Sequence, residues 1–129
     1  MTTPARPKSA LTPETVGDRV YDPMDFLKYS SNAATLVRLY GEDPDISLVI
    51  WNLEPGQENK THVHADYAQT FLILCGNGVL LRGADEKPVP IRTGQIVINP
   101  RMRPHGILNT GTEPLSYLAI SSRSASHRA

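Results

Sequence analysis

The sequence predicts an all-β sandwich or barrel, and two observations support this fold class. Short runs rich in β-branched and aromatic residues recur along the chain, with turn-forming residues between them. No long stretch with helical periodicity separates these runs. The expected strands are 35–40, 46–53, 70–75, 79–82, 96–98 and 115–121.

Turns between these strands are marked by glycine, proline, asparagine and aspartate. Gly76-Asn77-Gly78 lies between two apolar runs, which favours a β-hairpin at that point. Before the first strand, the segment 22–29 is expected to contain a short helical turn, because Pro23 follows Asp22.

The chain has 129 residues, which is enough for one domain with its own core. Residues 1–18 and 122–129 contain little apolar surface to offset the entropy of ordering. We therefore expect a flexible amino-terminal arm (1–18), a β-barrel domain (19–121) and a disordered carboxyl-terminal tail (122–129).

Charge and cysteine content limit the possible partners and the cellular compartment. Lysine plus arginine equals aspartate plus glutamate, 13 each, so nothing electrostatic favours nucleic acid or an acidic membrane surface. The first residues lack the apolar region of a secretory signal, and no apolar run approaches the roughly 20 residues that span a bilayer. The single cysteine, Cys75, excludes an intrachain disulfide. We therefore expect a soluble cytoplasmic protein.

Three of the four histidines have positions typical of metal ligands. His62 and His64 are two residues apart, so on a strand they share one face. His105 must come from another strand, so a site forms only if the fold brings the three together. Imidazole nitrogen suits Zn, Fe, Ni, Cu or Mn. The fourth histidine, His127, falls in the polar tail and is expected to be solvated.

The residues around these histidines resemble the two sequence motifs of the cupin superfamily over residues 56–109. Four positions match the first motif: Gly56, His62, His64 and Gly76. Four match the second: Gly94, Pro100, His105 and Asn109. Two positions differ, because Gln69 replaces the glutamate of the first motif and Met102 replaces a turn glycine of the second.

The resemblance implies a double-stranded β-helix, a jelly-roll-like barrel with a metal inside one mouth. It also implies a divalent transition metal (Zn, Fe, Ni or Mn) with His62, His64, Gln69 and His105 as ligands. Two alternatives remain open. The histidines can form a polar cluster without metal, and Gln69 can hydrogen-bond a water or a ligand histidine instead of the metal.

If Gln69 faces the metal, the two-residue period of a strand places Phe71, Ile73 and Cys75 on the same inner face. Cys75 is then either a packing residue or a reactive thiol. Trp51 and Leu53, on the strand before the first motif, are expected to be core or dimer contacts.

Tyr67, Arg101 and Arg103 are the candidates for catalytic roles near the metal. Tyr67 precedes Gln69 closely enough to reach the cavity as a proton donor, although packing within a loop is the alternative. Arg101 and Arg103 lie in the second motif, where a guanidinium would bind a carboxylate substrate, although solvation in a loop is the alternative.

Three histidines and an amide are neutral ligands, so they leave the charge of a divalent cation uncompensated. This favours a Lewis acid that polarises a substrate oxygen or bound water. The hypothesis is an isomerase, cyclase or lyase that acts on a small polar metabolite. The resemblance supports it, since cupins with glutamine at this position include a polyketide cyclase and a sugar-linearising enzyme of uronate catabolism. The alternatives are a metal-dependent dioxygenase and a non-catalytic binding or sensor protein.

Small single-domain cupins usually pair, so the resemblance also implies a homodimer. The run 46–51 is almost continuously apolar rather than alternating. We therefore expect both faces of this strand to be covered, one of them by a second subunit.

Overall fold

The computed structural model describes residues 18–123, and within this part the chain forms nine strands and one short 3₁₀ helix. The strands are β1 (Thr35–Tyr40), β2 (Ile46–Leu53), β3 (Glu58–His62), β4 (Ala68–Cys75), β5 (Asn77–Leu81), β6 (Val89–Arg92), β7 (Ile96–Asn99), β8 (His105–Leu108) and β9 (Leu115–Ser122). None of the described helices is long and apolar enough to cross a membrane.

The expected arm and tail fall almost entirely outside the described residues, and so does His127. The last strand, β9, runs through Ser122, one residue beyond the expected end of the barrel domain. Beyond it, the Arg123 amide donates to the Asp45 carbonyl at 2.9 Å.

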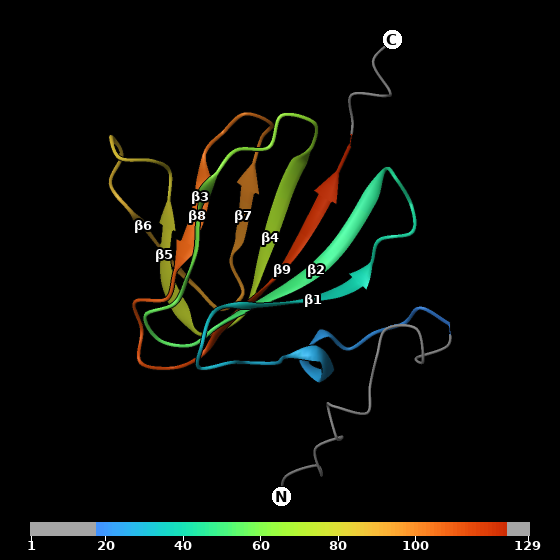
Figure 1. Ribbon diagram of the computed structural model, residues 1–129, viewed down its shortest axis with the longest axis horizontal. Helices are drawn as coiled ribbons and strands as arrows, with labels where there is room; N and C mark the ends of the chain where they lie inside the picture. The colour runs from blue at the N-terminus through green and yellow to red at the C-terminus, as the bar shows by residue number, and fades with distance from the viewer. Residues whose placement is uncertain (1–17, 124–129) are drawn as a thin grey trace, which may run out of the picture.

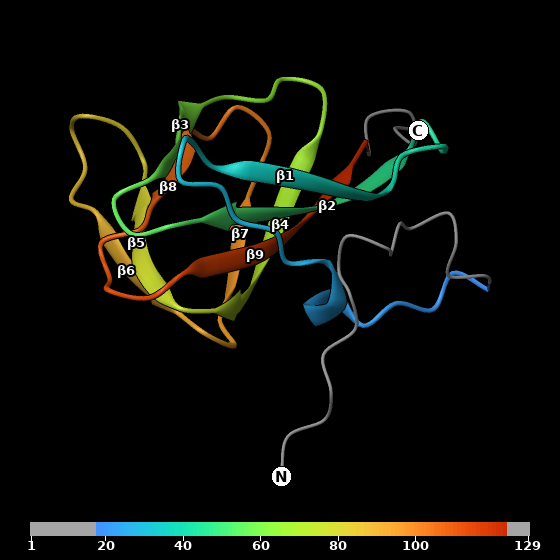
Figure 2. The same ribbon diagram turned by 60° about the horizontal axis from the view of Figure 1, so that its bottom comes forward.

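All strand pairs are antiparallel, and the strands form two sheets. One sheet has the order β1-β2-β9-β4-β7 and the other has the order β3-β8-β5-β6 (Figure 1). This arrangement confirms the all-β prediction. β9 lies between β2 and β4 in Figure 1, so the last strand occupies the middle of the larger sheet, and the turned view shows β9 running alongside β2 (Figure 2).

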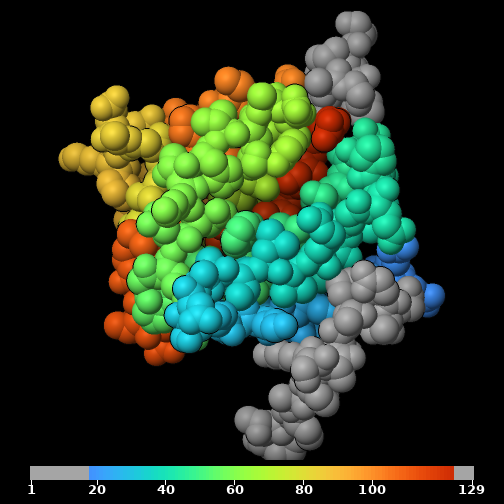
Figure 3. All heavy atoms as spheres, viewed as in Figure 1, coloured from blue at the N-terminus to red at the C-terminus, as the bar shows by residue number. Residues whose placement is uncertain are grey.

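The main core lies between the two sheets and follows the two-residue period of the strands. On β4, Phe71 and Ile73 point inward, and on β9, Leu115, Tyr117 and Ala119 do so. In the space-filling view, atoms of β9 are visible between the green segment and the teal β1–β2 segment (Figure 3).

A second apolar cluster covers part of the outer face of the larger sheet. The 3₁₀ helix η3 (Pro23–Phe26) begins after Asp22, whose side chain accepts from the Met24 amide at 3.0 Å. Phe26 then packs with Ile50 of β2, so β2 is covered on its outer face by this chain's own amino-terminal segment. The apolar run of β2 therefore does not require a second subunit as its cover.

The hairpin expected at Gly76-Asn77-Gly78 is wrong. β4 and β5 belong to different sheets and are not paired, so this turn carries the chain from one sheet to the other. Gly76 has φ +83°, and a Cβ there would clash with the carbonyl oxygen of Pro114. A Cβ at Gly78 would clash with the carbonyl oxygen of Leu108. The glycines allow a close crossing over other backbone segments, which a local turn pattern does not reveal.

Candidate functional site

The three histidines come from two neighbouring strands and the loop that follows one of them. His62 ends β3, His105 begins β8, and the two residues are direct partners in the β3–β8 ladder. His64 lies in the loop just after β3. The three ring centroids are 4.6 to 5.1 Å apart, and the ligand nitrogens all lie within 4.8 Å of one another. The structure thus brings together the three histidines that the sequence predicts.

Backbone carbonyls set the tautomer of two of these rings. His62 Nδ1 lies 2.6 Å from the carbonyl oxygen of Lys60, and His105 Nδ1 lies 3.0 Å from that of Arg103. A carbonyl oxygen can only accept a hydrogen bond, so each Nδ1 carries the proton. Each Nε2 therefore keeps its lone pair free for a ligand, which is the usual arrangement at metal sites.

Gln69 completes the group from β4. Its Nε2 donates to the Ser121 hydroxyl at 3.0 Å, which fixes the amide with Oε1 turned toward the histidines. Oε1 lies 3.1 Å from His105 Nε2, and both atoms are buried. The sequence pattern does not single out Ser121 as a site residue. It marks Ser121 only as the last residue of the expected strand 115–121.

The contact between Gln69 Oε1 and His105 Nε2 brings two acceptor atoms together. With Nδ1 protonated, both facing atoms are acceptors, unless His105 is doubly protonated. Burial, with additional repulsion from neighbouring charges, lowers the pKa of His105 to about 4, so the ring is neutral near pH 7. Burial also lowers the pKa of His64. The site thus holds three imidazoles close together, with the amide oxygen of Gln69 beside one of them. Such a set of neutral nitrogen and oxygen atoms fits a divalent transition metal.

Tyr67 stacks on His64, with ring centroids 4.3 Å apart, and its hydroxyl lies 3.4 Å from His64 Nε2. Burial raises the pKa of Tyr67 above its ordinary value, so the hydroxyl keeps its proton at neutral pH. Tyr67 therefore has both the position and the protonation state of a donor beside the histidines. It also lines a surface cavity of about 250 Å³, together with Ser121 and Arg123.

The two arginines of the second motif differ in their contacts. Arg103 pairs with Glu86 at 3.0 Å, and both side chains are about half exposed. Arg101 is exposed, as expected for a solvated loop residue. Neither side chain forms a hydrogen bond to the histidines among the described contacts.

Met102 replaces a motif glycine yet keeps the backbone conformation that glycine favours, with φ +70°. Its amide donates to the His64 carbonyl at 2.8 Å, which ties the loop before His105 to the loop that carries His64. The substitution therefore leaves the three histidines close together.

Cys75 does not lie on the inner face with Phe71 and Ile73, so this expectation is wrong. The register of β4 against β9 shifts between Ile73 and Cys75, and the shift turns Cys75 to the outer face of the sheet. On that outer face its sulfur lies 3.6 Å from the Tyr29 hydroxyl, so Cys75 does not line the histidine site. Leu53 is fully buried in the main core, which makes it a core contact, and the partly buried Trp51 packs against that core.

Comparison with known proteins identifies a protein family and several similar proteins. A family model described as "Cupin domain" matches residues 49–121. A glucose-6-phosphate isomerase of Thermococcus onnurineus is 32% identical over 97 residues, which are 67% of this chain and 51% of that protein. An oxalate-binding protein of Thermotoga maritima is 34% identical over 68 residues, 53% of this chain and 54% of that protein. The chain thus spans about half the length of these curated relatives.

Among solved structures, a Klebsiella pneumoniae protein of uncharacterized function with a double-stranded β-helix domain superposes with a TM-score of 0.76. The two chains are 23% identical, and the match covers 84% of this chain and 92% of the other. This likeness confirms the double-stranded β-helix as the fold.

Proposed function

Because this chain belongs to the cupin family, we propose that it is an enzyme that holds a divalent transition metal and acts on a small polar metabolite. The proposed ligands are His62, His64, Gln69 and His105, and the metal is Zn, Fe, Ni or Mn. The observation that carries the proposal is the pair of facing lone pairs on His105 Nε2 and Gln69 Oε1, 3.1 Å apart.

Isomerisation, cyclisation and elimination are the reaction types that this ligand set favours. All four ligands are neutral, so a bound divalent cation would keep its full charge for polarising a substrate oxygen. Tyr67 holds its phenolic proton beside His64 and would donate it, or a hydrogen bond, to the substrate.

The cavity lined by Tyr67 is the proposed approach for the substrate. Tyr67 contacts His64 and Ser121 contacts Gln69, so two of its lining residues touch the proposed ligands. Asp43, Asp45 and Arg123 also line it, and these charged groups suit a polar molecule rather than an apolar one.

The named relatives support two functions. A match to glucose-6-phosphate isomerase supports isomerase chemistry. The match to an oxalate-binding protein favours a second candidate, binding of a small carboxylate without turnover.

Elemental analysis of protein purified without added metal tests the ligand set. The parent protein is expected to retain close to one equivalent of a transition metal, and the double variant His62→Ala/His64→Ala is expected to retain almost none, because two of four ligands are gone. His127→Ala, which removes the remaining histidine, is the matched control and should retain metal. Equal metal content in the parent and the double variant would show that the ligands are elsewhere.

Turnover assays separate catalysis from binding alone. The metal-loaded protein is mixed with glucose 6-phosphate or oxalate, and products are followed by NMR while an electrode records oxygen. Product formation without oxygen uptake supports the proposed chemistry. Oxygen uptake that depends on substrate would instead identify a dioxygenase, and a shift in melting temperature without product would identify a binding protein.

A further inference from the structure

Asn99, at the end of β7, is fully buried and has one polar atom without a partner. Its Oδ1 accepts from Arg82 at 2.7 Å, but its Nδ2 has no hydrogen-bond partner among the described residues. A buried donor left unsatisfied costs about 1–3 kcal/mol, so such groups normally have a partner. A buried donor without a partner gains one when a ligand binds beside it, so its place in the fold decides whether it can contact a ligand.

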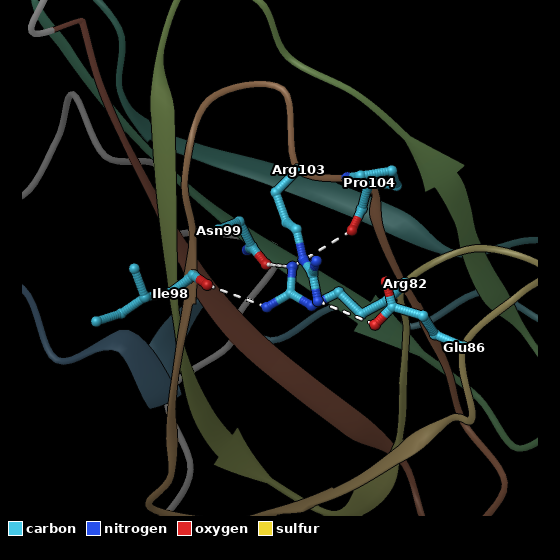
Figure 4. Close-up of polar contacts among 6 residues, drawn as sticks. All are labelled: Arg82, Glu86, Ile98, Asn99, Arg103 and Pro104. Carbon is cyan, nitrogen blue, oxygen red and sulfur yellow. Dashed lines mark hydrogen bonds and ion pairs between the residues drawn. The ribbon is translucent and has the colours of Figure 1, made fainter.

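Arg82 determines which way the Asn99 amide faces. A guanidinium only donates hydrogen bonds, so the amide oxygen must face it and the NH2 group must face away. Turning the amide over would set donor against donor. Arg82 is itself fixed by bonds to the carbonyl oxygens of Ile98, at 3.0 Å, and Pro104, at 3.3 Å (Figure 4).

Asn99 lies next to the proposed metal ligands. It is the direct partner of Gln69 in the β4–β7 ladder, and side chains directly opposite each other in a ladder share one face of the sheet. That face is the inner one, because Val97, two residues earlier, is buried in the core while Ile98 is exposed. Arg82 also contacts Pro104, the residue that precedes His105.

The charge around this pair favours an anion. Burial and, to a smaller extent, the nearby charge of Arg103 lower the pKa of Arg82, and the Glu86 carboxylate pairs with Arg103. Within the described part of the chain, Arg82 makes its hydrogen bonds to neutral oxygens and forms no ion pair. The loops that hold Arg82 and Arg103, residues 82–88 and 100–104, carry four positive charges (Arg82, Lys87, Arg101 and Arg103) against two negative charges (Asp85 and Glu86).

We propose that Asn99 Nδ2 donates a hydrogen bond to an anionic oxygen, of the carboxylate or enolate class, on the small molecule bound beside Gln69. Arg82 is a positioning residue that orients the Asn99 amide and, by binding its oxygen, makes its NH2 group a stronger donor. This assignment rests on the proposed metal site and names the substrate class and two further residues for it.

Acetate is the probe, and its affinity for the cobalt-loaded protein is measured by calorimetry and by the cobalt absorption spectrum. Asn99→Ala should bind acetate about tenfold more weakly, with cobalt content unchanged, because a bond to a charged acceptor is lost. Asn99→Asp keeps an oxygen for Arg82 but removes the donor, so it should bind acetate at least as weakly. This near-isosteric variant preserves the test if Asn99→Ala fails to fold.

The matched control is Asn52→Ala. Asn52 is also fully buried with an unpartnered Nδ2, but its Oδ1 accepts from Ser116 on the side of the sheet that faces Tyr29. This variant can lose stability, yet its affinity for acetate should equal that of the parent. Equal affinity in Asn99→Ala and the parent, both loaded with cobalt, would overturn the role of Asn99 while the metal site stands. A parent that takes up no cobalt would overturn both proposals.

A double-mutant cycle tests the role of Arg82. Arg82→Ala should weaken acetate binding, and the double variant Arg82→Ala/Asn99→Ala should lose much less than the sum of the two single losses, because Arg82 acts mainly through the amide. Arg82→Lys, which keeps the charge, should recover part of the affinity. Fully additive losses would show that Arg82 binds the anion itself and would overturn its role as a positioning residue.

Discussion

Among single residues, three of the four proposed ligands are each held by a group that leaves the ligand atom free. The carbonyls of Lys60 and Arg103 hold Nδ1 of His62 and His105, and the Ser121 hydroxyl holds the amide nitrogen of Gln69. The ligand atoms are therefore oriented by the protein alone, which lowers the entropy that metal binding must overcome.

The alternative roles of Gln69 can be separated by Gln69→Glu. If its Oε1 is a ligand, the carboxylate should bind hard cations more tightly and change the absorption spectrum of the cobalt-loaded protein, because a negative oxygen replaces a neutral one. Gln95→Glu is the matched control, since it makes the same change at a glutamine whose Oε1 accepts from the Arg92 amide instead. An identical cobalt spectrum before and after Gln69→Glu would place this side chain outside the ligand set.

The lowered pKa of His105 predicts acid sensitivity of the metal-free protein. Below about pH 6.5 the unfolded chain binds a proton at this histidine, but the folded protein does not do so until about pH 4. The unfolded state binds more protons in this window, so the free energy of unfolding should fall as pH falls from about 6.5 to about 4. Urea unfolding at a series of pH values measures the slope.

His105→Asn is the comparison for this pH series, because asparagine does not titrate. The variant should show a shallower loss of stability with acid, the remainder coming from His64 and other groups. Equal slopes in the parent and the variant would contradict the assigned burial of His105.

At the scale of elements, the site depends on how closely β3 approaches β8. Gly106 follows His105, and a Cβ added there would lie 2.7 Å from the Thr61 amide nitrogen and 2.8 Å from the Asn59 carbonyl oxygen. Both atoms belong to backbone, which cannot turn aside as a flexible side chain can. The absence of a side chain at Gly106 thus allows His62 to meet His105 across the ladder.

Gly106→Ala should therefore weaken metal binding by about tenfold or more, because β3 must move away from β8 and carry His62 with it. Competition with a chelator measures the affinity. Gly41→Ala is the control, since the atoms nearest to its added Cβ belong to the Arg38 side chain. Unchanged affinity in Gly106→Ala would mean that the ladder absorbs the methyl group without separating the ligands.

At the scale of the whole molecule, the outer face of the larger sheet is covered unevenly. The segment around η3 packs over Ile50 of β2. Toward the other edge, Ile96 and Ile98 on β7 are each 65% exposed. An edge strand with exposed apolar side chains commonly pairs with or packs against another chain.

We predict a homodimer that uses this part of the sheet. Light scattering at micromolar concentration should give twice the mass of the chain, and Ile96→Lys/Ile98→Lys should give the single mass, because two buried charges would oppose association. Val20→Lys, at another exposed apolar position, should leave the dimer intact. A monomer mass for the parent protein would contradict this prediction.

Much of the fold was predictable because its strands are locally apolar. The bounds of β1 and β2 agree with the expected ranges 35–40 and 46–53. β3, β6 and β8 were not predicted as strands, since β3 is mostly polar, β6 contains a proline, and β8 begins with a histidine and a glycine. Their backbone pairs with neighbouring strands, and such pairing leaves little trace in the residue pattern.

Motif spacing and alternating apolar residues are local properties, so the fold class and the three histidines of the proposed site could be predicted from the residues alone. Which other groups meet around them depends on the folded chain. A register shift turns Cys75 to the outer face of the larger sheet, and residues 76–78 connect the two sheets. Strand pairing places Asn99 directly opposite Gln69. These outcomes depend on pairing between strands far apart in the chain, and the free energy of such pairing comes from contacts that no local pattern contains.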